Sequence, residues 1–237
     1  MTTHDDRPLS SDLATGQPSV PVPAPAALPT GPGHFFPATA PGVPLSAFAF
    51  AFAVGFLGLV DSGILASAAS SMFIGVLLGI GSLGLLVGGL WEFRAGELFG
   101  GTFGLGYAGF LFSTGLILKF FAAPVIAAAG PLAFAHAFAA WLLMWAIFTG
   151  VFAIGARTIA WAAFMPFFLA FFVLVILAIG QLGGTASWAS DVTKIGGWVA
   201  IADGLAAGYL GSAILLNTTH ARDMLPLWPR QPGGQRA

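Results

Sequence analysis

The sequence predicts an all-α membrane protein: a bundle of six transmembrane helices with a proline-rich N-terminal tail. The first observation is composition, because the 237 residues are 57% hydrophobic and 7% charged, with a mean hydropathy of +0.91. A soluble domain carries roughly 25% charged residues, and a disordered chain combines low hydrophobicity with high charge. The second observation is that six long apolar segments follow one another after residue 44. Together they exclude a soluble monomer.

The N-terminal tail is set apart by its prolines. Residues 1–44 hold ten of the sixteen prolines and show no periodic apolar face. Such a segment cannot bury enough apolar surface to offset its chain entropy, so we expect a disordered tail with polyproline character. Asp5 and Asp6 stand where a signal peptide has basic residues. We therefore expect no signal peptide.

The six apolar segments are the expected spans of a transmembrane domain over residues 45–217. Each reaches the ~20 residues that a helix needs to cross the hydrocarbon core. They are too long, and alternate too little, to be strands of a membrane β-barrel. The segments cover residues 45–66, 71–92, 98–121, 131–156, 158–182 and 195–217.

The cations predict how the bundle is oriented. An even number of spans places both chain ends on one side of the bilayer, and that side has six arginines in its loops and tails. The opposite side has only Lys119 and Lys194. By the positive-inside rule both termini, including a short tail over residues 218–237, are expected in the cytoplasm. We expect a multi-pass protein of the plasma membrane or bacterial inner membrane.

Several function classes find no support in the residues. The net charge of −1 does not fit a nucleic-acid-binding protein, which typically has an excess of Lys and Arg. The chain has no cysteine, and its four histidines have no metal-ligand spacing. No nucleophile–base pair and no phosphate-binding glycine loop with a lysine is visible. We therefore expect no enzyme activity, no cofactor, no metal and no nucleic-acid partner.

Carboxylates inside the apolar segments indicate a polar path through the bundle. Asp61 lies late in the first span, Glu92 ends the second, and Asp203 lies within the sixth. A central aspartate costs roughly 2.5–3.5 kcal/mol on insertion scales, so such groups usually face a bundle interior or a water-filled cavity. Asp203 is the leading candidate. Asp61 and Glu92 lie nearer the interfaces, where helix capping or contact with lipid headgroups is an equal alternative.

Closely spaced glycines in the second, third and sixth spans predict tight helix packing. Small residues three or four positions apart let transmembrane backbones approach closely. The third span has five glycines around Tyr107 between residues 100 and 109. Besides packing, this density would leave room for a narrow path beside the tyrosine ring.

The stretch from Gly89 to Gly100, Gly-Leu-Trp-Glu-Phe-Arg-Ala-Gly-Glu-Leu-Phe-Gly, is followed by Tyr107. It resembles the signature of the acetate uptake transporter family, which contains bacterial succinate–acetate permeases and fungal acetate and ammonia permease relatives. The likeness spans residues 41–227. Three further stretches agree with it, namely Pro44-Leu45, residues 177–180, and Gly197-Trp198 with Gly204 and Tyr209.

This resemblance implies a six-helix protomer, a homohexameric ring, and a path for acetate and small carboxylates through each protomer. The family's narrowest point is similar to a ring of three hydrophobic side chains from the first, third and fifth spans. Phe50 and Tyr107 match the first two positions. We choose Leu169 as the third, in a fifth span that is longer here than in the family.

The chain also departs from the family pattern. The family's Asn-Thr pair after the second span is Glu97-Leu98 here, and the Ser before the tyrosine is Gly106. Hydrogen-bond donors that a carboxylate could use are thus lost, and carboxylates appear instead.

We expect a transporter or channel for acetate and other small monocarboxylates, with succinate as a further candidate substrate. Flux would be linked to protons, by symport or as the neutral acid, with Asp61 or Asp203 handling the proton and the hydroxyl of Tyr107 serving as a donor. A channel for ammonia, urea or another small solute is the alternative. An alternative of another class is a non-transporting membrane scaffold or sensor that acts through its tail. The residues leave chain-length preference, flux direction and channel or carrier behaviour open.

Overall fold

The computed structural model describes residues 41–230. These residues form six helical spans that are long and apolar enough to cross a membrane, and within residues 41–230 the only β-structure is an isolated bridge between Ala160 and Pro229. The predicted all-α, six-span fold is thereby confirmed. The tail prediction for residues 1–44 falls almost entirely outside the described residues, as does the end of the C-terminal tail.

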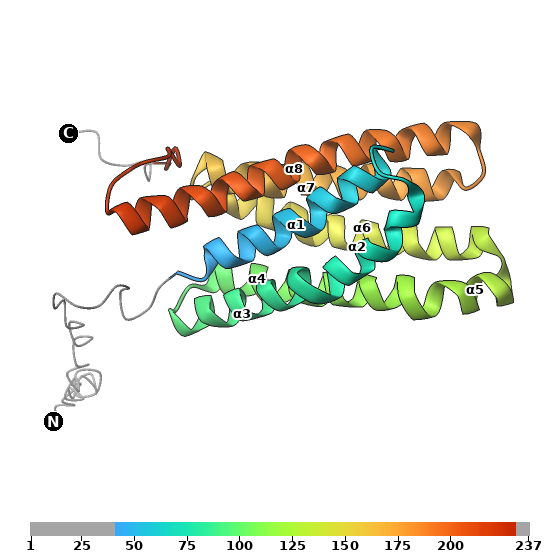
Figure 1. Ribbon diagram of the computed structural model, residues 1–237, viewed down its shortest axis with the longest axis horizontal. Helices are drawn as coiled ribbons and strands as arrows, with labels where there is room; N and C mark the ends of the chain where they lie inside the picture. Colours follow the sequence, from blue (N-terminus) through green and yellow to red (C-terminus); the bar gives the residue numbers. More distant parts are fainter. Residues whose placement is uncertain (1–40, 231–237) are drawn as a thin grey trace, which may run out of the picture. The chain divides into compact units, whose positions relative to one another are not determined.

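Four of the spans are single helices, and two are assembled from shorter pieces (Figure 1). The single helices are α1 (Val43–Asp61), α6 (Pro131–Ala156), α7 (Trp161–Gly183) and α8 (Ser187–His220). The second span consists of η1 (Ser67–Ala69), α2 (Ser70–Val76), η2 (Leu77–Gly81) and α3 (Ser82–Arg94). The third consists of α4 (Leu98–Leu116), η3 (Ile117–Phe121) and α5 (Ala122–Ala129).

Two helix boundaries differ from the expected ones for identifiable reasons. Helix α1 ends at Asp61 instead of continuing to residue 66, because the chain turns at Gly63, whose φ of +85° is left-handed. Helix α8 begins well before residue 195. Its first turns are polar, and they include an ion pair of 3.3 Å between Lys194 and Asp191. Hydropathy therefore underestimates the length of this helix.

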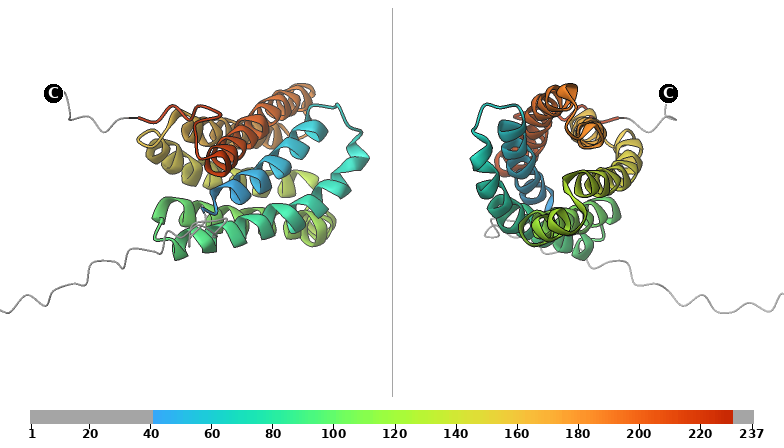
Figure 2. Two further views of the ribbon diagram at one scale, coloured as in Figure 1. Left: turned by 60° about the vertical axis from the view of Figure 1, so that its left-hand side comes forward. Right: turned by 90° about the vertical axis from the view of Figure 1, so that its right-hand side faces the viewer.

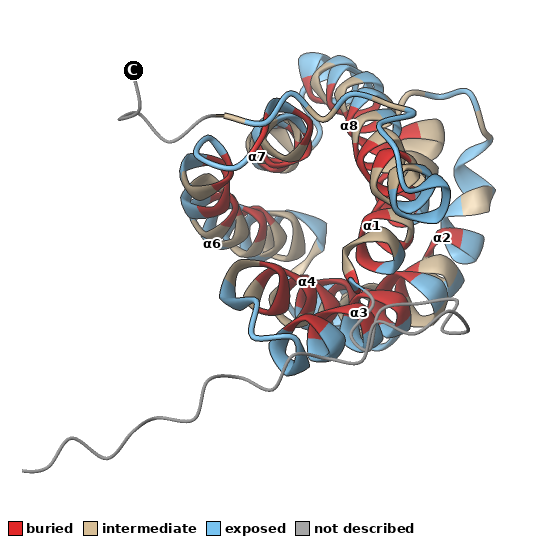
Figure 3. Cartoon of the chain, turned by 90° about the vertical axis from the view of Figure 1, so that its left-hand side faces the viewer, coloured by how far each residue is buried: buried red, intermediate tan, exposed pale blue. Residues whose placement is uncertain are grey.

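The spans surround a common interior. Helix α1 packs against α8, α7 lies between α6 and α8, and α3 packs against α4. Views along the bundle show the helices arranged in a ring (Figure 2), with their buried faces turned inward (Figure 3). Helix α1 begins and α8 ends at the same end, which we call the terminal end. We call the opposite end, where α1 ends and α8 begins, the far end (Figure 1).

Glycines set the closest approach between spans. A Cβ atom on Gly104 of α4 would collide with the backbone of Gly89 on α3. A Cβ on Gly204 of α8 would lie 2.9 Å from the Cα of Gly55 on α1. Both contacts require glycine, as expected where helices pack backbone to backbone in lipid.

The second span bends beside the interior. Gly79 in the π-helical turn η2 has φ −87° and ψ −111°, which interrupts the helical hydrogen bonding. The buried hydroxyl of Ser82 donates to the carbonyl of Leu77 and so satisfies one of the groups that the bend leaves free. Leu77 is only 1% exposed and faces the interior.

After α8 the chain folds back over the turn between α6 and α7. The first backbone N–H groups of α7, those of Trp161 and Ala162, donate to the carbonyls of Trp228 and Leu227 over 3.1 and 3.3 Å. The guanidinium of Arg230 lies 4.3 Å from the centre of the Trp161 ring. This part of the expected C-terminal tail therefore caps α7.

Candidate functional site: a closed interior path

The terminal half of the interior is filled by aromatic rings from α1, α4, α6 and α7. Neighbouring ring centroids are 5.0–6.4 Å apart, mostly in edge-to-face or tilted arrangements. We call this group the aromatic plug, and it consists of Phe50, Phe99, Phe103, Tyr107, Phe152 and Phe167.

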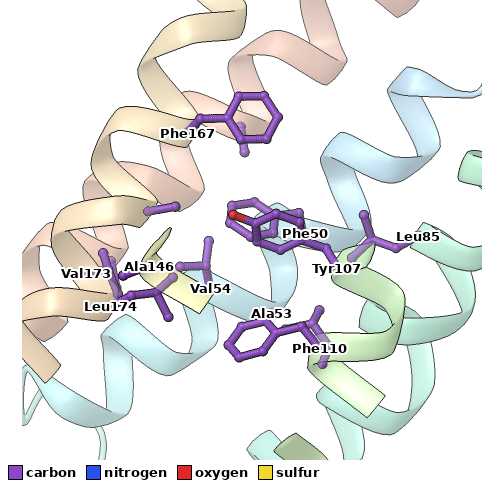
Figure 4. Packing of buried hydrophobic residues seen from close by; sticks show 14 of the residues in the cluster. Phe50, Ala53, Val54, Leu85, Tyr107, Phe110, Ala146, Phe167, Val173 and Leu174 are labelled. Atoms are coloured by element: carbon purple, nitrogen blue, oxygen red, sulfur yellow. The ribbon is translucent and has the colours of Figure 1, made fainter. Parts of the chain in front are cut away.

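The far half of the interior is hollow. A cavity of about 250 Å³ begins at Phe50 and Tyr107 and extends to Asp61 and Ser70 near the far end. We call it the inner cavity. Its walls are mostly apolar side chains, and Figure 4 shows the rings of Phe50 and Tyr107 together with Val173 of α7 at this level. The plug therefore separates the cavity from the terminal end.

Tyr107 is held in place from α6. Its hydroxyl lies 2.5 Å from Oγ1 of Thr149, whose own hydroxyl donates to the carbonyl of Trp145 over 2.7 Å. Because a threonine hydroxyl has one hydrogen, Tyr107 must be the donor in the first bond. The hydroxyl hydrogen of Tyr107, which the sequence suggested as a donor for a carboxylate, is thus already engaged.

Asp203 is the most unusual polar group of the interior. Its side chain is 0% exposed and lines the inner cavity, and neither carboxyl oxygen has a hydrogen-bond partner among the described residues. Within residues 41–230, no Lys, Arg or His lines this cavity. Asp61, half-buried, also contributes to the wall, closer to the far end. A buried carboxyl without a partner is costly.

Glu92 lies at a different place and has a structural contact. It is 3% exposed, and its Oε1 accepts the backbone N–H groups of Gly42 and, over 3.0 Å, Val43. These groups open α1, where a helix has N–H donors without partners and favours negative charge. Glu92 is absent from the residues that line the inner cavity. The structure therefore places it as a cap of α1 and apart from the two aspartates.

Leu169, expected as the third residue of the narrow ring, is half-buried and lies in neither the plug nor the cavity wall. On α7 the inward positions are Phe167, Ala170 and Leu174, at i, i+3 and i+7. This spacing describes one helix face, and Leu169 falls outside it. Phe167 is the residue that α7 contributes to the plug.

Several polar residues of the interior were not found by sequence reasoning. Thr149 holds the tyrosine, and Thr114 lines the inner cavity while accepting a 3.0 Å hydrogen bond from Nε1 of Trp141. Gln181 lines the cavity at the end of α7. The one signal available was a lone polar side chain in an otherwise apolar span, and threonine gives that signal weakly because its hydroxyl bonds its own helix readily.

The fold and the cavity define a multi-pass membrane protein with an interior path that is closed toward the terminal end. A sequence profile of the GPR1/FUN34/yaaH family matches residues 33–228. The chain belongs to this family, which confirms the resemblance noted from the signature around Glu92 and Tyr107. Membership in this family also agrees with the expectation that the protein is not an enzyme.

One individual protein is similar to this chain in sequence, and one solved structure is similar to it in fold. An uncharacterized protein of Methanothermobacter thermautotrophicus is 29% identical over 197 residues, which are 79% of this chain and 91% of that protein. The structure of the bacterial acetate channel SatP superposes with a TM-score of 0.69 at 24% identity. That match covers 79% of this chain and 98% of SatP, and it establishes a shared fold.

Proposed function

We propose that the protein carries acetate and other small monocarboxylates across the membrane, in a process linked to protons. The observation that carries the proposal is the inner cavity, which is apolar, ends at the rings of Phe50 and Tyr107, and has the buried carboxyl of Asp203 in its wall. Membership in the family and the fold shared with the acetate channel SatP support this choice of solute.

The cavity wall favours an acid with a small apolar body. The methyl group of acetate is compatible with the side chains from α1, α4 and α7. A carboxylate that enters such surroundings must exchange water for other donors, since an unpaired charge is expensive to bury. The buried Thr114 hydroxyl, which accepts from Trp141 and has no acceptor for its own hydrogen within the described residues, supplies one donor.

Asp203 is the basis for the link to protons. An acetate anion that passes it would bring two negative charges together where the cavity wall offers no cation. Repulsion between two carboxylates in a poorly solvated site is relieved when one of them binds a proton. Either the substrate crosses as the neutral acid or Asp203 carries the proton, and both routes couple flux to the proton gradient.

We also propose an orientation and an assembly. Arg94 is the last residue of α3, and Arg157 and Arg222 closely follow α6 and α8, so that all three lie at the terminal end, whereas Lys119 and Lys194 lie toward the far end. The positive-inside rule then places the terminal end in the cytoplasm of a plasma or inner membrane. The homohexamer is proposed from the family resemblance, and native mass spectrometry from nanodiscs tests it.

Uptake of labelled acetate into proteoliposomes, with and without an inward proton gradient, tests the proposal. We expect uptake that rises with the gradient and is competed by propionate. Succinate should compete poorly, because its second carboxylate would meet an apolar wall. Protein-free liposomes are the control. Acetate uptake that is the same with and without the gradient would contradict the link to protons. The absence of acetate uptake by folded protein would contradict acetate as the solute.

Ammonia or urea is the second candidate solute. Asp61 and Asp203, in a wall without cations, favour a cationic or neutral passenger over an anion. Competition separates the two functions, because acetate analogues should block a carboxylate path and leave ammonia flux unchanged.

A scaffold or sensor that acts through the proline-rich tail is the candidate from another class. The tail lies outside the described residues, so this alternative is tested by deletion of residues 1–40. A transporter should keep its flux after the deletion, whereas a scaffold should lose its cellular phenotype.

A further inference from the structure

A second, more polar cavity adjoins the inner cavity at the far end. It has a volume of about 560 Å³ and lies between the start of α6, the end of α7 and the start of α8. We call it the outer cavity. No charged side chain from the described part of the chain lines it, and its polar lining residues are Gln181, Thr185, Ser187, Ser190 and Thr193.

Two residues line both cavities, namely Gln181 of α7 and Thr193 of α8. These two residues lie at the junction between the polar outer cavity and the apolar inner cavity. The helices are close at this point, because a Cβ on Gly180 would lie 2.5 Å from Oγ1 of Thr193. A solute that moves from the outer to the inner cavity must therefore pass these two side chains.

The two junction residues offer different hydrogen bonds. The hydroxyl of Thr193 donates to the carbonyl of Ala189 over 3.0 Å, so that only its lone pairs remain for a solute. The backbone carbonyl of Gln181 accepts from the N–H of Gly184 over 3.1 Å, which fixes the end of α7. The side-chain amide of Gln181 takes part in no hydrogen bond within the described part of the chain.

Among the described residues that line the two cavities, Gln181 is also the one with a side-chain N–H group. An amide suits a carboxyl group in both protonation states. Its N–H donates to a carboxylate, and its N–H and C=O together pair with a neutral acid. Because the amide is uncharged, it can replace lost water without holding the solute as tightly as a cation would.

We propose that Gln181 determines specificity for carboxyl solutes by hydrogen-bonding the carboxyl group as it passes from the outer to the inner cavity. This inference rests on the proposed carboxylate transport. It adds to that proposal a donor other than Thr114, which lies at the junction of the two cavities beside the far end.

The test compares variants in proteoliposomes loaded for acetate uptake. Gln181→Leu keeps similar size and removes the donors, and we expect its KM for acetate to rise about ten-fold with a smaller change in maximal rate, the effect of losing one hydrogen bond to a charged group. Gln181→Glu keeps the shape and adds negative charge, so we expect a larger loss that is partly recovered at lower pH. Gln181→Met is a second apolar variant in case the leucine variant fails to fold.

Two controls make the result specific. Ser71→Ala, which removes an exposed hydroxyl at the far end that lines neither cavity, should leave the KM unchanged. Thr193→Val removes hydroxyl lone pairs at the junction but no free donor, so it should raise the KM less than Gln181→Leu does. A wild-type KM in Gln181→Leu or Gln181→Met, or an equal rise in Thr193→Val, would overturn the role of Gln181 while acetate transport stands. Absence of acetate flux in the wild type would instead refute the transport proposal itself, and the role of Gln181 with it.

Discussion

The hydroxyl of Tyr107 on α4 lies 2.5 Å from Oγ1 of Thr149 on α6 and donates its hydrogen to it. This bond ties the ring that closes the inner cavity to a neighbouring span. We expect the ring to act as a barrier and the hydroxyl to hold it in position. A role for the hydroxyl as a donor to the solute would require this bond to break.

This relationship gives opposite predictions for two substitutions of Tyr107. Tyr107→Phe keeps the ring, so acetate flux should stay within about two-fold of wild type, while thermal stability falls slightly through the loss of about 1 kcal/mol of hydrogen bonding. Tyr107→Ala removes the one ring of the plug that is tied to Thr149, widens the plug beside the inner cavity, and should raise flux and admit larger acids. Uptake of acetate and benzoate into proteoliposomes measures the flux of both variants, and a thermal melt measures the stability of Tyr107→Phe. Abolished flux in folded Tyr107→Phe would show that the hydroxyl serves the solute directly.

Replacement of Asp203 by asparagine should flatten the pH dependence of flux. The amide of asparagine has nearly the shape of the carboxyl group, but it does not titrate at the pH values of the assay. A transport step that needs a proton on this side chain is therefore lost. Asp61→Asn is the matched variant, because Asp61 lines the same cavity and is half-buried, in better contact with water. We expect it to change the profile less. An unchanged profile in Asp203→Asn would exclude Asp203 from the proton link.

Glu92 should matter for stability and leave the pH profile of flux unchanged. Glu92→Ala removes the acceptor for the N–H groups of Gly42 and Val43, and we expect a loss of about 2 kcal/mol in the free energy of unfolding. Glu97→Ala, at an exposed site nearby, should cost far less. Thermal melts followed by circular dichroism in detergent compare the two. A changed pH profile of flux in a stable Glu92 variant would argue for a place in the path.

The glycine contact between α3 and α4 can be tested with a control in the same helix. Gly104→Ala puts a methyl group into the backbone of Gly89 and should lower the melting temperature by several degrees, since the two helices must separate. Gly109→Ala meets no atom within 4 Å and should leave the melting temperature unchanged or raise it, because alanine favours the helix. Equal melting temperatures for the two variants would contradict the packing described for these helices.

The site was partly predictable. Phe50 and Tyr107 were identified from the family resemblance, and the structure brings them together with ring centroids 5.3 Å apart. Asp203 was identified from its chemistry alone, because a carboxyl group in the middle of an apolar span is costly whichever side of the helix it lies on. Leu169 lies outside the inward face of α7, and the choice among adjacent residues could not be made from the sequence because it depends on the rotation of that helix, whose residues are apolar on every side.

The number, order and approximate limits of the six spans are properties that the sequence by itself determined. Hydropathy is a local quantity, and a bilayer demands about 20 apolar residues from each span whatever its neighbours are. The tertiary structure alone decided which polar groups meet. Glu92 became a cap because α1 begins beside it, and Gln181 came to lie at the junction of two cavities because α7 and α8 approach at Gly180. Such encounters depend on the rotation and spacing of packed helices, which residues distant in the chain set jointly.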